Sequence, residues 1–145
     1  MSSKITLKHY PEIQLLRKED EPVDAMQKLG YEDILMRWIN YHIKKNGGNR
    51  EVHNLGNDMA DGYAYGHVLQ SVAPSLPKNY YDLDKDGRAK EVIETCKRED
   101  MNPPINPDGI TSGNPRLNTL LCAEIFNNKH GLYFEEEKEI PDFPA

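Results

Sequence analysis

The chain has 145 residues, a net charge of -6 and an isoelectric point near 5.4. This length accommodates one domain with a substantial core and is too short for two. A mean hydropathy of -0.78 argues against a membrane-spanning segment. The acidic balance, without a long basic run, argues against a nucleic-acid partner, because nucleic acids are bound mainly through lysine and arginine contacts to phosphate.

The two cysteines indicate a reducing compartment. Cys96 and Cys122 show neither the paired spacing of a zinc site nor the density of a secreted disulfide scaffold. The N-terminal stretch MSSKITLKHYPE contains no apolar signal core. We therefore expect a cytoplasmic protein.

Residues 1–30 have the pattern of a connector rather than of a domain. After Pro11, a short apolar set predicts a brief helix, and the charge run at 17–22, which ends in proline, predicts a solvated turn. A second apolar set then leads to Gly30. We expect this segment to be partly helical and to pack onto the domain in patches, through Ile13, Leu15, Leu16, Val23, Met26 and Leu29.

Residues 31–46 carry the clearest signal of an amphipathic helix. The first turn is acidic and the last is basic, which complements the helix dipole, and Gly47 suits the left-handed conformation that ends helices. Trp38 lies in the middle of the apolar stripe, where we expect it to anchor the core, and we expect His42 on the same stripe to be half-buried. The stripe consists of Ile34, Leu35, Trp38, Ile39 and His42, and the residues expected to face solvent are Glu32, Arg37, Asn40, Lys44 and Lys45.

Two further helices are predicted in the middle of the chain. The first covers residues 61–73, where Asp61 is suited to cap the start and Pro74 ends the helix. The second covers residues 87–99, with a short apolar face formed by Ala89, Val92, Ile93 and Cys96.

The last part of the chain contains a fourth long helix. Asn114-Pro115 has the cap-then-proline signature of a helix start, and the apolar residues that follow predict a helix over 115–128. The same signature at Asn106-Pro107 predicts one short helical turn. Residues 134–145 are acidic and interrupted by prolines, so we interpret them as a tail or linker.

Together these patterns predict an all-α fold without strands. Its four main helices are expected at about 31–46, 61–73, 87–99 and 115–128, with short helical turns between them. We expect the core to include Trp38, Leu69, Leu117, Leu121 and Ile125.

The acidic stretch at 82–87, DLDKDG, has some features of a calcium-binding loop. Such a loop needs a glutamate at its twelfth position, which here is Ile93, and Glu94 comes one residue late. We therefore interpret the stretch as a solvated loop that caps the helix after it, and we expect no tight calcium binding.

Catalytic and cofactor signatures are absent from the sequence. His42, His53 and His67 have no helix-face metal spacing, and there is no nucleophile elbow, phosphate loop or cysteine beside a histidine. We expect neither an enzyme nor a bound cofactor or metal.

Three segments in order resemble the calponin-homology modules of the fimbrin/plastin family. They are ILMRWINYHIKKNG, NLGNDMADGYAYGHVLQSVAP and ITSGNPRLNTLLCAEIFNN. The preceding IQLLRKEDEPVDAMQKLG is similar to the segment that joins the first module to the second in these proteins. The resemblance implies the calponin-homology fold over residues 31–133, as the second module of the first actin-binding region, and it identifies residues 1–30 as a connector from a preceding module.

The same resemblance implies two partners, filamentous actin and the adjacent calponin-homology module. In this family the first helix of the second module carries an auxiliary actin-contacting stretch. Carried over to this chain, that stretch gives as candidate actin-binding residues Arg37, Asn40, Lys44 and Lys45.

Two alternatives stay open. The first is that the chain is a structural interaction module that docks on its sister module without direct actin contact. The net charge of -6 favours this alternative, because actin is also acidic. A phosphoinositide site with little sequence support would consist of Lys44, Lys45 and Arg50.

Overall fold

The computed structural model describes residues 5–134, and every regular element in that range is a helix. The main helices are α1 (Tyr31–Lys45), α2 (Tyr63–Val72), α3 (Lys85–Arg98) and α5 (Pro115–Lys129). Shorter ones are α4 (Pro107–Thr111) and the 3-10 helices η2 (Pro11–Leu16), η3 (Ala25–Lys28), η4 (Asn57–Met59) and η5 (Tyr80–Asp82). The all-α prediction, with four main helices and short helical turns, is therefore confirmed. The predicted tail at 134–145 lies outside the described residues, except for residue 134.

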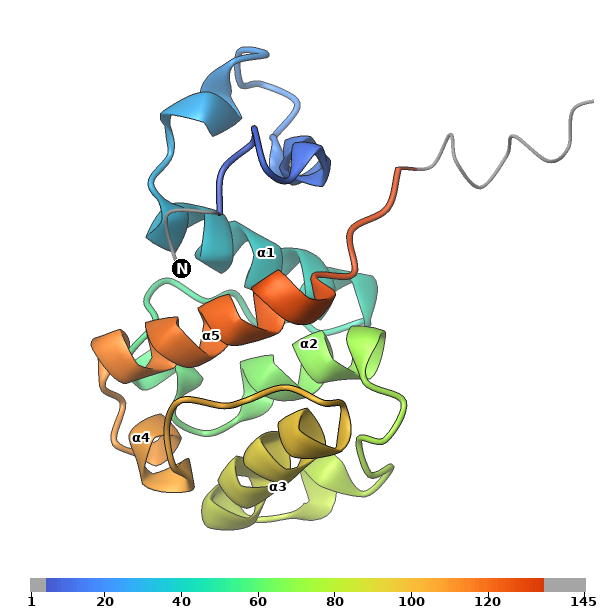
Figure 1. Cartoon of the computed structure of the whole chain (residues 1–145), viewed down its shortest axis with the longest axis vertical. Helices are drawn as coiled ribbons and strands as arrows, with labels where there is room; N and C mark the ends of the chain where they lie inside the picture. The colour runs from blue at the N-terminus through green and yellow to red at the C-terminus, as the bar shows by residue number, and fades with distance from the viewer. Residues whose placement is uncertain (1–4, 135–145) are drawn as a thin grey trace, which may run out of the picture.

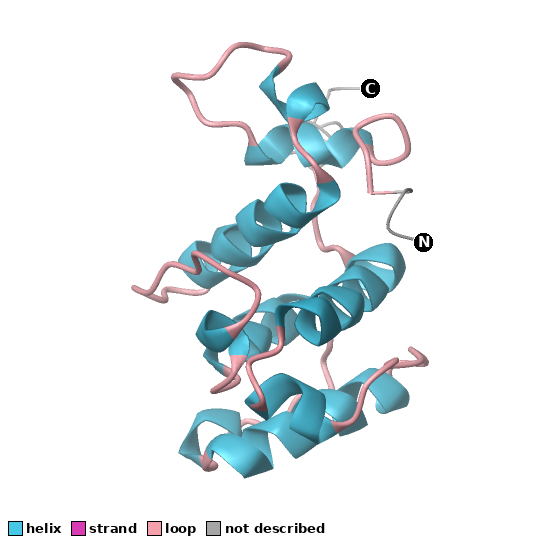
Figure 2. Cartoon of the chain, turned by 90° about the vertical axis from the view of Figure 1, so that its left-hand side faces the viewer, coloured by secondary structure: helices cyan, strands magenta, loops and turns pink. Residues whose placement is uncertain are grey.

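The helices are stacked along the long axis of the molecule (Figure 1). Residues 5–30, which we call the connector, lie at one end against α1. α1 packs on α2 and α5 in the middle, and α3 and α4 pack on each other at the opposite end. Figure 2 shows the same order from the side. Across residues 5–134, no helix combines the length and the hydropathy that a membrane crossing requires.

The helix starts follow capping chemistry, with small shifts from the predicted positions. Asn114 caps α5 as expected, because its side-chain oxygen accepts from the N–H of Leu117 at 3.2 Å. α3 begins two residues earlier than predicted, because the Asp84 carboxylate accepts from Gly87 N at 2.7 Å. This contact confirms that the acidic loop caps α3.

The start of α2 differs from the prediction. Asp61 is not its N-cap residue; that position belongs to Gly62, whose φ of +78° is the left-handed conformation that glycine adopts readily. Asp61 still contributes, because its carboxylate accepts from Tyr63 N at 3.0 Å. The helix therefore begins at residue 63 rather than 61.

The interior contains most of the apolar residues that the sequence places there. Trp38, Leu69, Leu121 and Ile125 are each 0% exposed. Leu117 is only partly buried, because it lies in the first turn of α5 and packs at the edge of the core. The neighbouring Leu120 is 42% exposed, because it lies on the outward side of α5, opposite the buried residues.

His42 is completely buried, which corrects the expectation that it is half-buried. Its Nε2 lies 2.8 Å from the carbonyl oxygen of His130, and its Nδ1 lies 2.9 Å from Ser71 Oγ. A carbonyl only accepts, so Nε2 carries the proton and Nδ1 accepts from the serine hydroxyl. Asn46 donates to the same hydroxyl oxygen at 2.8 Å, and Trp38 Nε1 donates to the His130 carbonyl at 2.8 Å.

A second buried polar contact connects α2 to α5. The Tyr65 hydroxyl donates to Asn118 Oδ1 at 2.7 Å, and Asn118 Nδ2 donates to the Asn114 carbonyl at 3.1 Å. Tyr65 and Asn118 are both buried. Since a buried polar atom without a partner costs free energy, this pair fixes how the two helices sit against each other.

We predict that the protein loses stability as the pH falls from 6.5 towards 4. Burial lowers the pKa of His42 from its ordinary 6.5 to about 4, so in this window the unfolded chain binds more protons than the folded chain. The contribution is complete above pH 6.5, and its loss at low pH amounts to about 3 kcal/mol. Burial also lowers the pKa of His67 and of His130, which adds to the loss in the same direction.

Urea unfolding at a series of pH values measures this effect. In His42→Gln the free energy of unfolding should depend less on pH than in the unchanged chain, whereas His53→Gln, at an exposed position, should preserve the full dependence. Equal pH dependence in all three proteins would contradict the assignment to His42.

We predict that Tyr65→Phe destabilises the fold by about 1–3 kcal/mol, because it leaves the buried Asn118 oxygen without its hydroxyl donor. The control is Tyr133→Phe, which also removes a tyrosine hydroxyl. It should have little effect on stability, because the Tyr133 side chain is 61% exposed. Thermal and urea unfolding of both variants would test this, and equal stabilities would show that the hydroxyl pairing is unimportant.

Candidate functional site

The four residues predicted as the contact surface do not form one patch on α1. Successive residues of an α-helix are rotated by about 100°, so Arg37, Asn40 and Lys44 lie within about 60° of one another. Lys45 is rotated by about 100° from Lys44. We call Arg37, Asn40 and Lys44 the α1 row.

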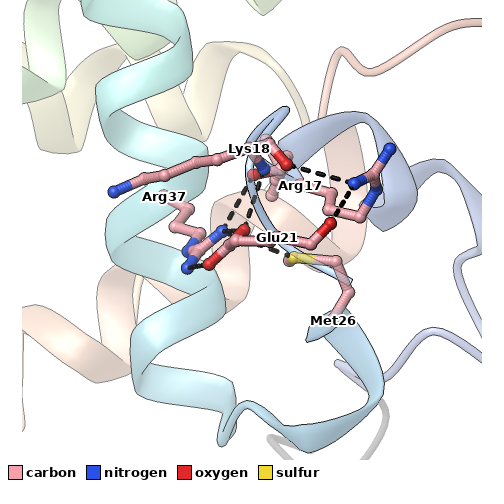
Figure 3. A network of polar contacts seen from close by, with 6 residues as sticks. Arg17, Lys18, Glu21, Met26 and Arg37 are labelled. Atoms are coloured by element: carbon pink, nitrogen blue, oxygen red, sulfur yellow. Dashed lines mark hydrogen bonds and ion pairs between the residues drawn. The ribbon is translucent and has the colours of Figure 1, made fainter. Parts of the chain in front are cut away.

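Arg37 is held by the connector rather than free in solvent. Its two terminal nitrogens donate to the two carboxylate oxygens of Glu21, each at 2.6 Å (Figure 3). The side chains of the pair are only 21% and 23% exposed. This corrects the expectation that Arg37 faces solvent, and it also corrects the description of residues 17–22 as a simple solvated turn.

Glu21 is itself fixed by the loop that carries it. Its Oε1 accepts from the backbone N–H of Lys18 at 2.8 Å, and its carbonyl accepts from the Arg17 guanidinium. The hydrogen bonds from Arg37 and then from Lys18 hold the pKa of Glu21 at about 2. The carboxylate therefore stays charged throughout the physiological range.

Arg37 makes two more contacts with the connector, to the Leu16 carbonyl at 3.2 Å and to Met26 Sδ at 3.7 Å. Leu16 and Met26 are buried, as are Ile5 and Ile13. The connector between residues 5 and 30 thus contributes to the core and closes over the first half of the α1 row.

Asn40 is also occupied, by the loop after α1. Its Nδ2 donates to the Val52 carbonyl at 3.0 Å, and its Oδ1 accepts from Val52 N at 2.7 Å. The side chain therefore pairs with the backbone of Val52 in both directions and is not free for a partner, contrary to the sequence-based expectation.

Lys44 and Lys45 are exposed, as the sequence predicts. Lys44 borders a shallow hollow that the chain forms beyond the end of α1, together with Asn40, Gly48, Asn49, Arg50 and Glu51. The end of the helix shapes this hollow: Gly47 has a φ of +81°, and Gly48 N donates to the Ile43 carbonyl at 2.8 Å.

Arg50, the third residue of the phosphoinositide hypothesis, is engaged within the fold. It forms an ion pair with Asp61 at 2.7 Å, and its guanidinium carbon lies 3.9 Å from the centre of the Tyr63 ring. Among residues 5–134, no three histidine, cysteine, aspartate or glutamate side chains gather as a metal site requires.

Two residues that sequence reasoning missed therefore determine this surface. Glu21 lies 16 residues before Arg37, and Val52 lies 12 residues after Asn40. No helical spacing or motif connects either pair. The charge run at 17–22 is the only available signal, and it does not identify which acid meets which base.

Fimbrins and plastins are similar to this chain over most of its length. The fimbrin of Saccharomyces cerevisiae is 36% identical over 99% of the chain, and that of Schizosaccharomyces pombe is 35% identical over 96%. Human plastin-3 is 27% identical over 94%. The chain spans 23% of the length of each of these proteins.

A solved structure and a family model agree with these relatives. The crystal structure of the actin-crosslinking core of Schizosaccharomyces pombe fimbrin matches 88% of the chain with a TM-score of 0.71 and 33% identity, and the chain covers 28% of it. The model of the calponin homology (CH) domain matches residues 30–131, which is well over half of the sequence. This helical chain therefore belongs to the calponin-homology domain family.

Proposed function

We propose that this chain is one actin-filament-binding module of a fimbrin- or plastin-like bundling protein, and the second calponin-homology module of its first actin-binding region. The similarity to an actin-crosslinking core carries the proposal, because it extends over most of the chain. The module supports an adjacent calponin-homology module of the same protein. It acts without catalysis, in the actin cytoskeleton of the cytoplasm.

The proposed filament-facing surface is the α1 row with Lys45 beside it. Lys44 and Lys45 are its exposed members, and both carry the positive charge that an acidic filament attracts. Asn40 supports this surface indirectly by fixing at Val52 the loop whose residues 48–51 line the hollow beside Lys44. Arg37 belongs to the same row and is paired with Glu21.

The second candidate is a supporting module that docks on its sister module and makes no filament contact. The net charge of -6 favours it, because long-range electrostatics between two acidic proteins are repulsive. The internal engagement of Arg37 and Asn40 favours it as well, because it leaves fewer polar groups free for a filament. Phosphoinositide binding has less support, since Arg50 is paired with Asp61.

Cosedimentation with actin filaments separates the two candidates. If α1 carries its own filament contact, the 145-residue chain should pellet saturably with filaments at physiological salt. Absence of pelleting by a chain that unfolds cooperatively would favour the supporting role.

We predict that the Lys44→Glu, Lys45→Glu double variant weakens cosedimentation by about fivefold or more, because it reverses two exposed charges of the surface. Of the single variants, Lys44→Glu should have the larger effect, since Lys44 shares a face of α1 with Arg37 and Asn40. The matched control is Lys85→Glu, Lys90→Glu, which makes the same charge change on exposed positions of α3. If both double variants weakened filament binding equally, the change in net charge would explain the effect. The assignment of the filament contact to α1 would then be wrong.

A further inference from the structure

The ion pair between Glu21 and Arg37 lies on the surface that the proposed function uses. Arg37 precedes Lys44 by seven residues, so the two cations lie on one face of α1 about 10 Å apart. The hollow beside Lys44 has a counterpart on the other side of Asn40, lined by Leu29, Asp33, Met36, Arg37, Asn40, Val52 and His53. The α1 row therefore extends towards the connector and ends at Arg37, which already binds the carboxylate of Glu21.

The geometry of the pair is that of a complete recognition site for one carboxylate. Both terminal nitrogens of Arg37 donate to Glu21 at 2.6 Å, in the two-pronged arrangement that guanidinium groups form with carboxylates (Figure 3). A carboxylate from another protein would use the same two donors. Glu21 and an external carboxylate therefore cannot bind Arg37 in this way at the same time.

The loop around Glu21 is also held by contacts that do not involve Arg37. The backbone N–H of Lys18 and the guanidinium of Arg17 both bind within the loop, and Leu16 and Met26 anchor its two ends in the core. Each partner of the ion pair is about one-fifth exposed, so the contact is partly accessible to water and to an incoming group. Exchange of one carboxylate for another thus requires a local displacement and not unfolding of the connector.

We propose that Glu21 is a built-in competitor that occupies Arg37, and that a carboxylate in an acidic segment of the filament takes its place on binding. This inference rests on the proposed function, because it concerns the same face of α1. It assigns the connector a regulatory role: the cationic row is short when Glu21 is engaged and extends from Lys44 to Arg37 when it is released. An intramolecular competitor weakens the contact, since it is present at high effective concentration.

Removal of the competitor tests the proposal in the 145-residue chain. Glu21→Gln keeps the size of the side chain and an oxygen for the Lys18 N–H, but it removes the charge that holds Arg37. We expect binding to actin filaments at physiological salt to tighten by about two- to fivefold, the range of a partly exposed ion pair. The matched control is Glu19→Gln, which removes the same charge from an exposed position in the same loop and should have a smaller effect.

A second variant identifies Arg37 as the group that is released. Adding Arg37→Gln to Glu21→Gln should cancel the gain, because the freed cation is then absent. Thermal unfolding of each variant verifies that the fold is retained. If Glu21→Gln destabilises the chain, the binding comparison is made at a temperature where all variants are folded.

The outcomes separate this inference from the proposed function. Tighter binding by Glu21→Gln than by Glu19→Gln, reversed by Arg37→Gln, supports the competitor. Equal or weaker binding by Glu21→Gln, while the Lys44 and Lys45 variants still lose affinity, overturns the competitor and leaves the filament surface in place. Absence of filament binding by every variant overturns both.

Discussion

A single backbone oxygen, the carbonyl of His130, receives two side-chain hydrogen bonds from α1, and the packing of the central helices depends on it. Trp38 and His42 both donate to it at 2.8 Å. The last carbonyls of a helix have no partner within the helix, and a buried one must find a donor elsewhere. Here the end of α5 is completed by α1, so the two helices have one preferred register. Ser71 and Asn46 extend the same network to α2.

This arrangement uses α1 on nearly all of its sides. One side carries the buried stripe around Trp38, and another is covered by the connector through Arg37 and by the following loop through Asn40. The exposed lysines near the C-terminal end of α1 are what this packing leaves to a partner. The structural role of α1 and its proposed binding role therefore compete for the same side chains, and the connector is where the two roles meet.

Local patterns in the sequence predict the helices. The features that the sequence did not predict depend on contacts between residues far apart in the chain. Helical spacing located the four main helices to within two residues at each end, and Asn114 identified the start of α5 because a cap acts on its immediate neighbours. The depth of His42 was underestimated, because its partners Ser71 and His130 are 29 and 88 residues away.

The candidate surface was harder to predict than the helices, because it too depends on contacts between distant residues. Lys44 and Lys45 are exposed as expected, but the amphipathic pattern of α1 does not show that Arg37 and Asn40 meet other segments. Both lie on the polar face of the helix, and a polar face is consistent with either solvent or a polar partner. Only the folded chain brings Glu21 and Val52 to that face. The domain boundary near residue 30 stays a prediction.

The packing of the connector also determines how the module would bear mechanical load. Four apolar residues of the connector are buried against the rest of the fold: Ile5, Ile13, Leu16 and Met26. Glu21 of the connector also forms an ion pair with Arg37 of α1. Tension applied at the N-terminal end would reach these contacts before it reaches α1, so the connector would peel away first while the helical core remains folded.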